Sequence, residues 1–395
     1  MISDKFSEGG QLLPYPKLSK RDEKYLREYK YKGEDRGILN NLVLNKFYDF
    51  IVDKLLPSFL APNTITLLGP TLVILETIFI IIRNGDSAEQ LEEGPTNGPL
   101  DHIFAAFSIF FFLTADNVDG KHARHIHLCS TLGDWLDHSL DVVSYFCIIL
   151  TGIHYFSLGI GTVFMGVTTV LVTYELVMWE AYVLDEFIIH EFEACSEGMV
   201  AIAGFHTLAL FIDPSKRPSF VPDKFYFKMP FLMTVFGGIN ILAALIALVK
   251  SINRRFKGNS KVVITTIFIH IPVVLPSISA YALWHFFPDV VYAHHWSWTI
   301  YLCSSGMFWI YLVNVARLLG WSITLMDIVK RPFHFVMTGL PWVLMKFVGV
   351  EKAIVYSAVA CFAAILYIWI VITHSFRKSL NVSLWNVPKD INKEK

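Results

Sequence analysis

Residues 64–82 read TITLLGPTLVILETIFIII, a run in which Glu76 is the only charged residue. A helix of about 20 apolar residues is long enough to cross the hydrocarbon core of a bilayer. Similar runs recur along the chain, which is 54% hydrophobic and 17% charged, with a mean hydropathy of +0.49. Soluble proteins have a charged fraction of about 25%. The sequence therefore predicts an all-α integral membrane protein.

Ten such runs predict about ten transmembrane helices. The first five are Thr64–Ile82, His102–Ala115, Asp141–Phe156, Ile160–Trp179 and Glu197–Ile212. The other five are Met229–Val249, Val262–Phe286, Trp296–Leu318, Phe333–Gly349 and Ala353–Thr373. The second, third and ninth runs are short for a span, so their ends are the least defined.

Residues 1–60 are predicted to form a cytosolic N-terminal segment, and residues 1–37 contain no apolar stretch that would serve as a cleavable signal peptide. Between Ile38 and Leu56, apolar residues recur at helical spacing. This pattern predicts an amphipathic helix in the membrane interface, and a helix packed on the protein's own cytosolic face is the alternative.

The basic residues predict the orientation of the chain. They are concentrated before the first run, after the sixth run and in the tail at 377–395. Short loops rich in Lys and Arg face the cytosol, so both termini are predicted to be cytosolic. The basic residues between 213 and 228 fall on the other side and disagree with this rule.

One polar segment lies at the predicted membrane boundary: residues 116–141 read DNVDGKHARHIHLCSTLGDWLDHSLD. Asp116 and Asp119 are three residues apart and Asp137 and Asp141 four apart, so each pair shares one helix face. A short turn between two helices would bring all four carboxylates together at the cytosolic end. Crowded carboxylates repel one another unless cations neutralise them. Hard oxygen ligands suit Mg²⁺, Mn²⁺ or Ca²⁺, and we therefore predict a site for two divalent cations, Mg²⁺ or Mn²⁺ first among them, that acts on phosphoryl or pyrophosphate groups.

The small and basic residues of the segment support a phosphate ligand. Gly120 and Ala123 lack bulk, so a ligand can approach the backbone closely. Arg124 is placed to bind a phosphate oxygen. The alternative is a solvated interfacial loop whose acids are caps and ion pairs.

The spacing D-x2-D-G-x2-A-R-x8-G-x3-D-x3-D resembles the signature of the CDP-alcohol phosphotransferase family. Its fixed positions are Asp116, Asp119, Gly120, Ala123, Arg124, Gly133, Asp137 and Asp141. Three features resemble the choline/ethanolamine phosphotransferase branch of this family. They are the length of the chain, the N-terminal motif Tyr29-x-Tyr31-x-Gly33-x-Asp35, and the stretch Ala61-Pro62-Asn63 just before the first run. The similarity runs from about residue 25 to 212, and His125 and Ser139 depart from the branch pattern.

The resemblance implies an enzyme that transfers phosphocholine and/or phosphoethanolamine from CDP-choline or CDP-ethanolamine to diacylglycerol, releasing CMP. It implies a catalytic core at 61–212, followed by further transmembrane helices at 213–376. The aspartates would hold two divalent cations. The residues expected to contact the CDP-alcohol are Asn63, Asp116, Gly120, Lys121, Ala123, Arg124 and Gly133.

The acceptor hydroxyl must lose a proton, so the site needs a base. The branch resemblance implies His138 supported by Glu197, and Asp141 is the competing candidate. The resemblance also implies a homodimer in the endoplasmic reticulum or Golgi membrane, with the active site facing the cytosol. The alternatives are a relative with another head group, such as inositol, and a cation channel or transporter. A net charge of −1 does not suggest a nucleic-acid partner.

Overall fold

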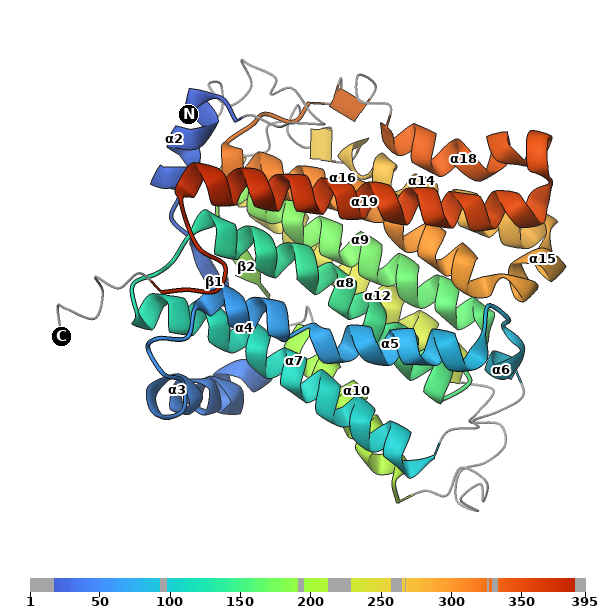
Figure 1. The fold of residues 1–395 in the computed structure, drawn as a ribbon, viewed down its shortest axis with the longest axis horizontal. Helices are drawn as coiled ribbons and strands as arrows, with labels where there is room; N and C mark the ends of the chain where they lie inside the picture. Colours follow the sequence, from blue (N-terminus) through green and yellow to red (C-terminus); the bar gives the residue numbers. More distant parts are fainter. Residues whose placement is uncertain are drawn as a thin grey trace.

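The computed structural model describes residues 18–92, 98–190, 195–211, 229–256, 265–266, 268–324, 327–328 and 333–387, which form a bundle of long helices (Figure 1). Across these residues, six helical segments are long and apolar enough to cross a membrane. They are Pro62–Asn84, Pro99–His125, Thr131–Tyr155, Ile160–Leu184, His295–Leu319 and Val350–Leu380. The predicted all-α architecture is confirmed.

Within the described residues, each of the ten predicted runs contains a helix, but a count of about ten spans is not confirmed. The helices at the remaining four runs are α10 Cys195–Ala209, α12 Met229–Phe256, α14 Ile271–Phe286 and α18 Phe333–Val348. Over the described residues, three of these helices are apolar but too short to count as full spans. They are residues 237–253 of α12, α14 and α18. The predicted start of the seventh run, Val262, lies outside the described residues; residues 265–266 and 268–269 are helical, and α14 begins at Ile271 with Pro272 in its first turn. Proline is tolerated there because first-turn amides have no partner within the helix.

The first span is positioned by close contact with the second span. It consists of α4 (Pro62–Leu68) and α5 (Thr71–Asn84), separated by Gly69 and Pro70. A Cβ at Gly69 would lie 2.9 Å from the Cβ of Ala115 in α7 (Pro99–His125). Glycine thus allows α4 to approach α7 directly beside the aspartate segment.

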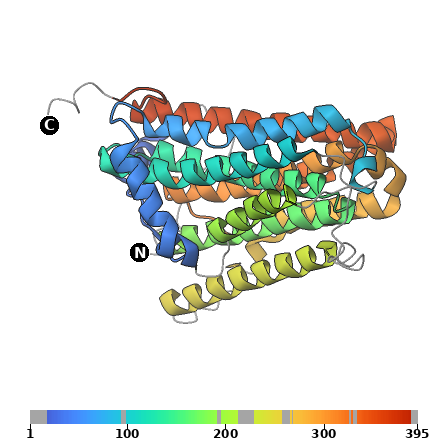
Figure 2. The ribbon, with the colours of Figure 1, turned by 90° about the horizontal axis from the view of Figure 1, so that it is seen from below.

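Helix α16 (His295–Leu319) forms the centre of the bundle and packs against α9 (Ile160–Leu184), α14 and α19 (Val350–Leu380). Its apolar window is entirely buried, as expected for a helix that is hydrophobic all round. By contrast, α12 runs along one outer edge beside α9 (Figure 2).

The N-terminal elements gather at one end of the bundle (Figure 1). They are α2 Lys20–Glu28, β1 Gly33–Asp35, a π-helical turn Asn40–Leu44 and α3 Asn45–Lys54. Strand β1 pairs in parallel with β2 (Phe187–Ile189), with Gly33 opposite Phe187. The short helices α6 (Glu89–Glu92) and α15 (Pro288–Ala293) lie at the opposite end.

Residues 40–54 are helical, in the region where an amphipathic helix was predicted. Tyr48 and Val52 are buried in a cluster with residues of α7, while Phe50 and Leu55 are exposed. One face therefore packs on the protein and the other presents apolar side chains outward. Its place in the membrane interface stays a prediction.

Candidate active site

The aspartate segment forms the corner between α7 and α8 (Thr131–Tyr155). Helix α7 continues to His125, ten residues beyond the predicted end of that span at Ala115, and α8 begins ten residues before the predicted start at Asp141. Ser130 caps α8, because its hydroxyl accepts a hydrogen bond from the Gly133 amide at 3.1 Å. The polar segment is therefore itself helical, and the short connection at 126–130 brings the two ends together.

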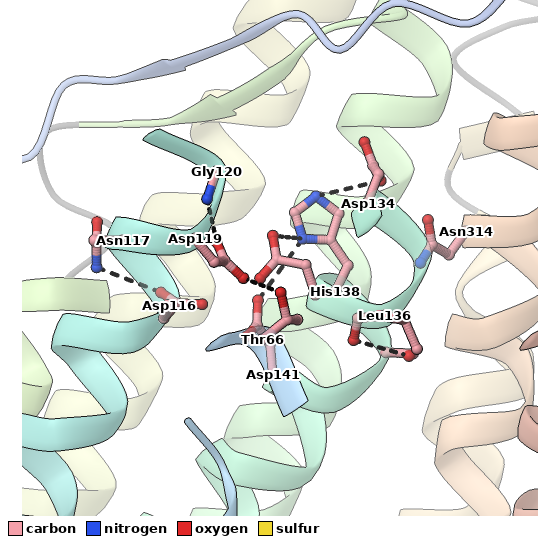
Figure 3. Close-up of polar contacts among 12 residues, drawn as sticks. Thr66, Asp116, Asn117, Asp119, Gly120, Asp134, Leu136, His138, Asp141 and Asn314 are labelled. Atoms are coloured by element: carbon pink, nitrogen blue, oxygen red, sulfur yellow. Dashed lines mark hydrogen bonds and ion pairs between the residues drawn. The ribbon is translucent and has the colours of Figure 1, made fainter. Parts of the chain in front are cut away.

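The four predicted aspartates line the same cavity at this corner, and Figure 3 shows three of them, Asp116, Asp119 and Asp141. The carboxyl group of Asp116 lies within hydrogen-bonding reach of those of Asp137 and Asp141. Asp119 accepts hydrogen bonds from the Thr66 hydroxyl and from the Gly120 amide. Asp119 and Asp141 are buried, so these acidic groups are largely shielded from water.

The protein supplies little positive charge to this cluster. Lys121 Nζ instead lies 2.6 Å from Asp49 Oδ1, and the Arg317 guanidinium pairs with Asp134. No lysine or arginine within the described residues forms an ion pair with the four aspartates. A set of oxygen donors without such ion pairs, of which Asp119 and Asp141 are buried and Asp116 and Asp137 half-buried, is suited to Mg²⁺ or Mn²⁺. The residues present thus fit the predicted divalent cations.

A cavity of about 1420 Å³ opens from the aspartates into the bundle. Its polar end is lined by the α7–α8 corner and by Tyr29, Tyr31 and Asp35 of the N-terminal segment. Farther along, its walls are apolar side chains of α8, α9 and α10, among them Ile153, Met165, Ile202 and Phe205. One end of the cavity is therefore acidic and suited to metal ions, and the other end is apolar and suited to lipid chains.

The N-terminal motif Tyr29-x-Tyr31-x-Gly33-x-Asp35 lies at this polar end of the cavity. Although the Tyr31 side chain is 43% exposed, the protein around it, followed by the carboxylates of Asp134 and Asp137, raises the pKa of its phenol above the ordinary value. Burial also raises the pKa of Asp35, whose side chain accepts hydrogen bonds from the Gly37 amide and from Asn40. At neutral pH, Tyr31 therefore remains a neutral phenol beside the acidic cluster.

His138 lies between carboxylates and is almost fully buried (Figure 3). Its Nδ1 is 3.5 Å from Asp137 Oδ2 and 3.7 Å from Asp141 Oδ2. Its ring stacks on Phe187 of β2, with centroids 4.4 Å apart. Neither ring nitrogen has a hydrogen-bond partner within the described structure. The imidazole is therefore held by packing, beside the carboxyl groups and free to accept a proton.

Glu197 is placed differently from the predicted pairing. Its Oε1 accepts a hydrogen bond from the Leu39 amide at 2.9 Å. In the parts of the chain that the structure describes, no hydrogen bond or ion pair joins Glu197 to His138. The structure does not bring this predicted pair together, because Glu197 caps the start of the N-terminal helical turn. A role for Glu197 in the reaction stays a prediction.

The residues predicted to contact the CDP-alcohol all line the cavity: Asn63, Asp116, Gly120, Lys121, Ala123, Arg124 and Gly133. A Cβ at Gly133 would lie 3.3 Å from Asn63 Oδ1, so a larger residue would crowd that amide. The Asn63 amide nitrogen donates to Ser383 O at 3.4 Å, which ties this wall to the C-terminal tail. Contact with nucleotide stays a prediction for each residue.

Sequence reasoning missed the ion pair between Asp134 and Arg317. Asp134 lies within residues 116–141 but is not one of the fixed positions of the family signature. Arg317 is a lone charge near the end of an apolar run, and such a residue normally has a partner. That rule could have identified Arg317 as a residue in need of an acid, although not which acid.

Comparison with known proteins adds an independent finding. The family model for CDP-alcohol phosphatidyltransferase matches residues 59–212. An uncharacterized CDP-alcohol phosphatidyltransferase class-I family protein 3 of Dictyostelium discoideum is 30% identical, over 47% of this chain and 45% of the relative. Choline/ethanolaminephosphotransferase 1 of Saccharomyces cerevisiae is 26% identical, over 45% of this chain and 44% of the relative.

A third relative carries a different name. CDP-diacylglycerol–serine O-phosphatidyltransferase of Encephalitozoon cuniculi is 30% identical, over 47% of each chain. The alignments thus span a little less than half the length of these relatives. The matched region contains the α7–α8 corner and all four clustered aspartates. Residues 59–212 therefore form a domain of the CDP-alcohol phosphatidyltransferase family.

Proposed function

We propose that this protein transfers phosphocholine and/or phosphoethanolamine from CDP-choline or CDP-ethanolamine to diacylglycerol. The observation that supports this proposal is the cavity that joins the cluster of four aspartates to apolar walls. The acidic end suits a metal-bound pyrophosphate, and the apolar end suits acyl chains. The products would be phosphatidylcholine or phosphatidylethanolamine, and CMP.

Each residue of the corner would have a distinct role. Asp116, Asp119, Asp137 and Asp141 would hold two ions of Mg²⁺ or Mn²⁺. When bound, these ions would neutralise the pyrophosphate and the departing CMP. Arg124, with Gly120 and Ala123 beside it, would bind phosphate oxygens, and Asn63, Lys121 and Gly133 would form the nearby wall.

The reaction would be a displacement at phosphorus. The diacylglycerol hydroxyl oxygen bonds to the phosphorus that carries the choline or ethanolamine group, and the pyrophosphate P–O bond to CMP breaks. His138 would accept the hydroxyl proton, since its ring nitrogens have no hydrogen-bond partner in the described structure. Asp141, 3.7 Å from that ring, is the alternative base.

We also propose a multi-pass homodimer of the endoplasmic reticulum or Golgi membrane, with the aspartate corner facing the cytosol. The six membrane-length helices support the multi-pass topology. The excess of Lys and Arg before the first span supports the orientation.

A second candidate is transfer of a phosphatidyl group from CDP-diacylglycerol to a small alcohol. The similarity to a protein named CDP-diacylglycerol–serine O-phosphatidyltransferase favours it. The same acidic corner could bind that pyrophosphate, with the apolar end holding the nucleotide-linked lipid.

The test is CMP release by the purified full chain in detergent micelles with Mg²⁺. One arm contains diacylglycerol with CDP-choline or CDP-ethanolamine, and the other contains CDP-diacylglycerol with serine or inositol. We expect CMP and a new phospholipid in the first arm. Turnover only in the second arm would replace the proposal with the second candidate, and no CMP in either arm would refute both.

A further inference from the structure

The cavity continues far beyond the acidic corner. It follows α8 from Asp137 to Phe156, the residue that ends the helix, and every turn between them contributes a lining residue. Helix α9, which packs beside α8, lines the cavity from Thr162 to Val177. A helix rises about 1.5 Å per residue, so the cavity is about 28 Å long along α8.

This length exceeds that of one lipid chain in a bilayer. The hydrocarbon core is about 30 Å thick, so the acyl chains of one leaflet occupy a depth of about 15 Å. Gly152 follows Asp141 by eleven residues, which corresponds to about 16 Å along α8. An acyl chain whose glycerol lies at the acidic corner would therefore end near Gly152, and Phe156 lies one helical turn deeper.

The far end of the cavity is suited to the end of an acyl chain. The Phe156 ring lines it and packs against the rings of His102 and His206, with centroids 5.3 Å and 4.9 Å away. The Thr162 hydroxyl, at the same end, donates to Leu158 O at 2.6 Å, so its hydrogen is already bonded. Among the described residues that line this end, none is charged. Methylene and methyl groups would thus meet a surface of matching polarity.

Gly152 leaves space in the cavity that helix packing does not require. A Cβ at this position would lie 3.8 Å from Ile202 Cγ2 and 4.0 Å from His206 Nε2, which are ordinary van der Waals distances. Gly166, which also lines the cavity, differs, because a Cβ there would lie only 2.7 Å from Ile149. Glycine weakens the interior of a helix relative to alanine. Gly152 therefore enlarges the cavity without serving a close contact between helices.

We propose that Gly152 sets the length of acyl chain that the enzyme accepts, with Phe156 as the end wall of the cavity. This inference rests on the proposed function, because it presumes that lipid occupies the apolar end. It makes Gly152 a specificity-determining residue that lies about 16 Å along α8 from the acids of the reaction centre.

Two substitutions should change the preferred chain length in opposite directions. Gly152→Leu fills the cavity where the acyl chain ends, whereas Phe156→Ala removes a ring from the end wall and lengthens the cavity. Gly204→Leu is the matched control, because it also adds a leucine side chain to a helical glycine with open space around it, but on α10 and outside the cavity lining.

The assay is a competition between diacylglycerols of different chain length. Purified full-length protein in detergent micelles receives CDP-choline or CDP-ethanolamine, Mg²⁺, and an equimolar mixture of dioctanoylglycerol, dimyristoylglycerol and dioleoylglycerol. Mass spectrometry of the phospholipid products then gives the ratios of kcat/KM, which are the measure of discrimination between competing substrates. The melting temperature of each variant is recorded in parallel.

We expect Gly152→Leu to lower the yield of dioleoyl product relative to dioctanoyl product about tenfold. This is the low end of the discrimination that one methylene of misfit gives in an apolar pocket, because a flexible acyl chain can bend away. Phe156→Ala should raise the same ratio, and Gly204→Leu should keep the wild-type ratio. A wild-type ratio in Gly152→Leu would overturn the proposal. An equal loss of all three products at an unchanged melting temperature would also overturn it, since the added side chain would then disturb the reaction centre and not the acyl chain.

Phe156→Ala decides the question if Gly152→Leu does not fold, and an unchanged ratio in that variant would overturn the proposal. A wild type that releases no CMP with any diacylglycerol would instead refute the proposed function. If only CDP-diacylglycerol supports turnover, the same variants are compared with CDP-diacylglycerols of the three chain lengths, and the same shifts are expected. The two failures are therefore distinguishable.

Discussion

Removing divalent cations tests the acidic cluster most directly. The ligand atoms offered by Asp137, His138 and Asp141 all lie within 4.8 Å of one another. Two ionised carboxylates at that separation repel by about 3.5 kcal/mol in an environment with an effective dielectric constant of about 20. Asp116 and Asp119 line the same end of the cavity and add to this repulsion. A bound divalent cation replaces repulsion with attraction, so we expect metal to stabilise the folded protein as well as to support turnover.

The magnitude follows from mass action. A ligand at one hundred times its Kd stabilises the folded state by about 2.7 kcal/mol. At about 2 °C per kcal/mol for a large chain, Mg²⁺ should raise the melting temperature of chelated protein by about 5 °C. The assay is thermal unfolding in detergent after EDTA treatment and dialysis, followed by Mg²⁺ titration, with CMP release measured in parallel.

Variants show whether the cluster is responsible for that shift. Asp137→Asn should lose most of the Mg²⁺-dependent shift. Glu180→Gln, which removes a buried carboxylate outside the cavity lining, should keep it. Full turnover after thorough chelation would refute the reasoning. An equal Mg²⁺ shift in Asp137→Asn and wild type would place the metal elsewhere.

Four further variants probe the corner and its surroundings. Asp119→Ala should abolish CMP release while the protein still folds, because it removes a ligand from the metal site; measurable turnover at the wild-type rate would contradict that role. His138→Ala should lower kcat about 10²- to 10⁴-fold with little change in Kd for the CDP-alcohol, whereas a loss within about threefold is too small for a base. Glu197→Gln should lower stability by about 1 kcal/mol, since the Leu39 amide loses a charged acceptor, and should leave kcat near wild type; a large kcat loss would restore Glu197 as the partner of His138. Gly69→Ala should cost about 1–3 kcal/mol by forcing α4 away from α7, and unchanged denaturation would show that the contact relaxes freely.

The features that the sequence predicted are local ones. The four aspartates of the cluster lie within one short segment, and helical spacing places each pair on one helix face. A short turn between the two helices was then enough to bring the two pairs together. Apolar runs likewise predicted helices wherever they occurred. The span limits were less accurate, because α7 continues through a polar segment that apolar periodicity alone excludes.

The features that the sequence did not predict depend on tertiary packing. Asp134 and Arg317 are 183 residues apart, and nothing in their local surroundings identifies one as the partner of the other. Glu197 was expected near His138 because both lie at the same membrane depth. The structure instead turns Glu197 toward Leu39, since an unpaired amide at the start of the N-terminal helical turn provides a donor there.

The distance between Asp134 and Arg317 along the chain has a consequence for biosynthesis. During translation, α8 enters the membrane long before α16 is made, and until then Asp134 has no guanidinium beside it. An unpaired acid at the membrane boundary raises the free energy of α8 in its final position in the membrane. Strand β1 must likewise wait for residue 187 before it can pair. A chain that stops before α16 would thus contain the whole family domain but lack the cation that completes it, and we expect such a fragment to be a substrate for degradation and not a smaller enzyme.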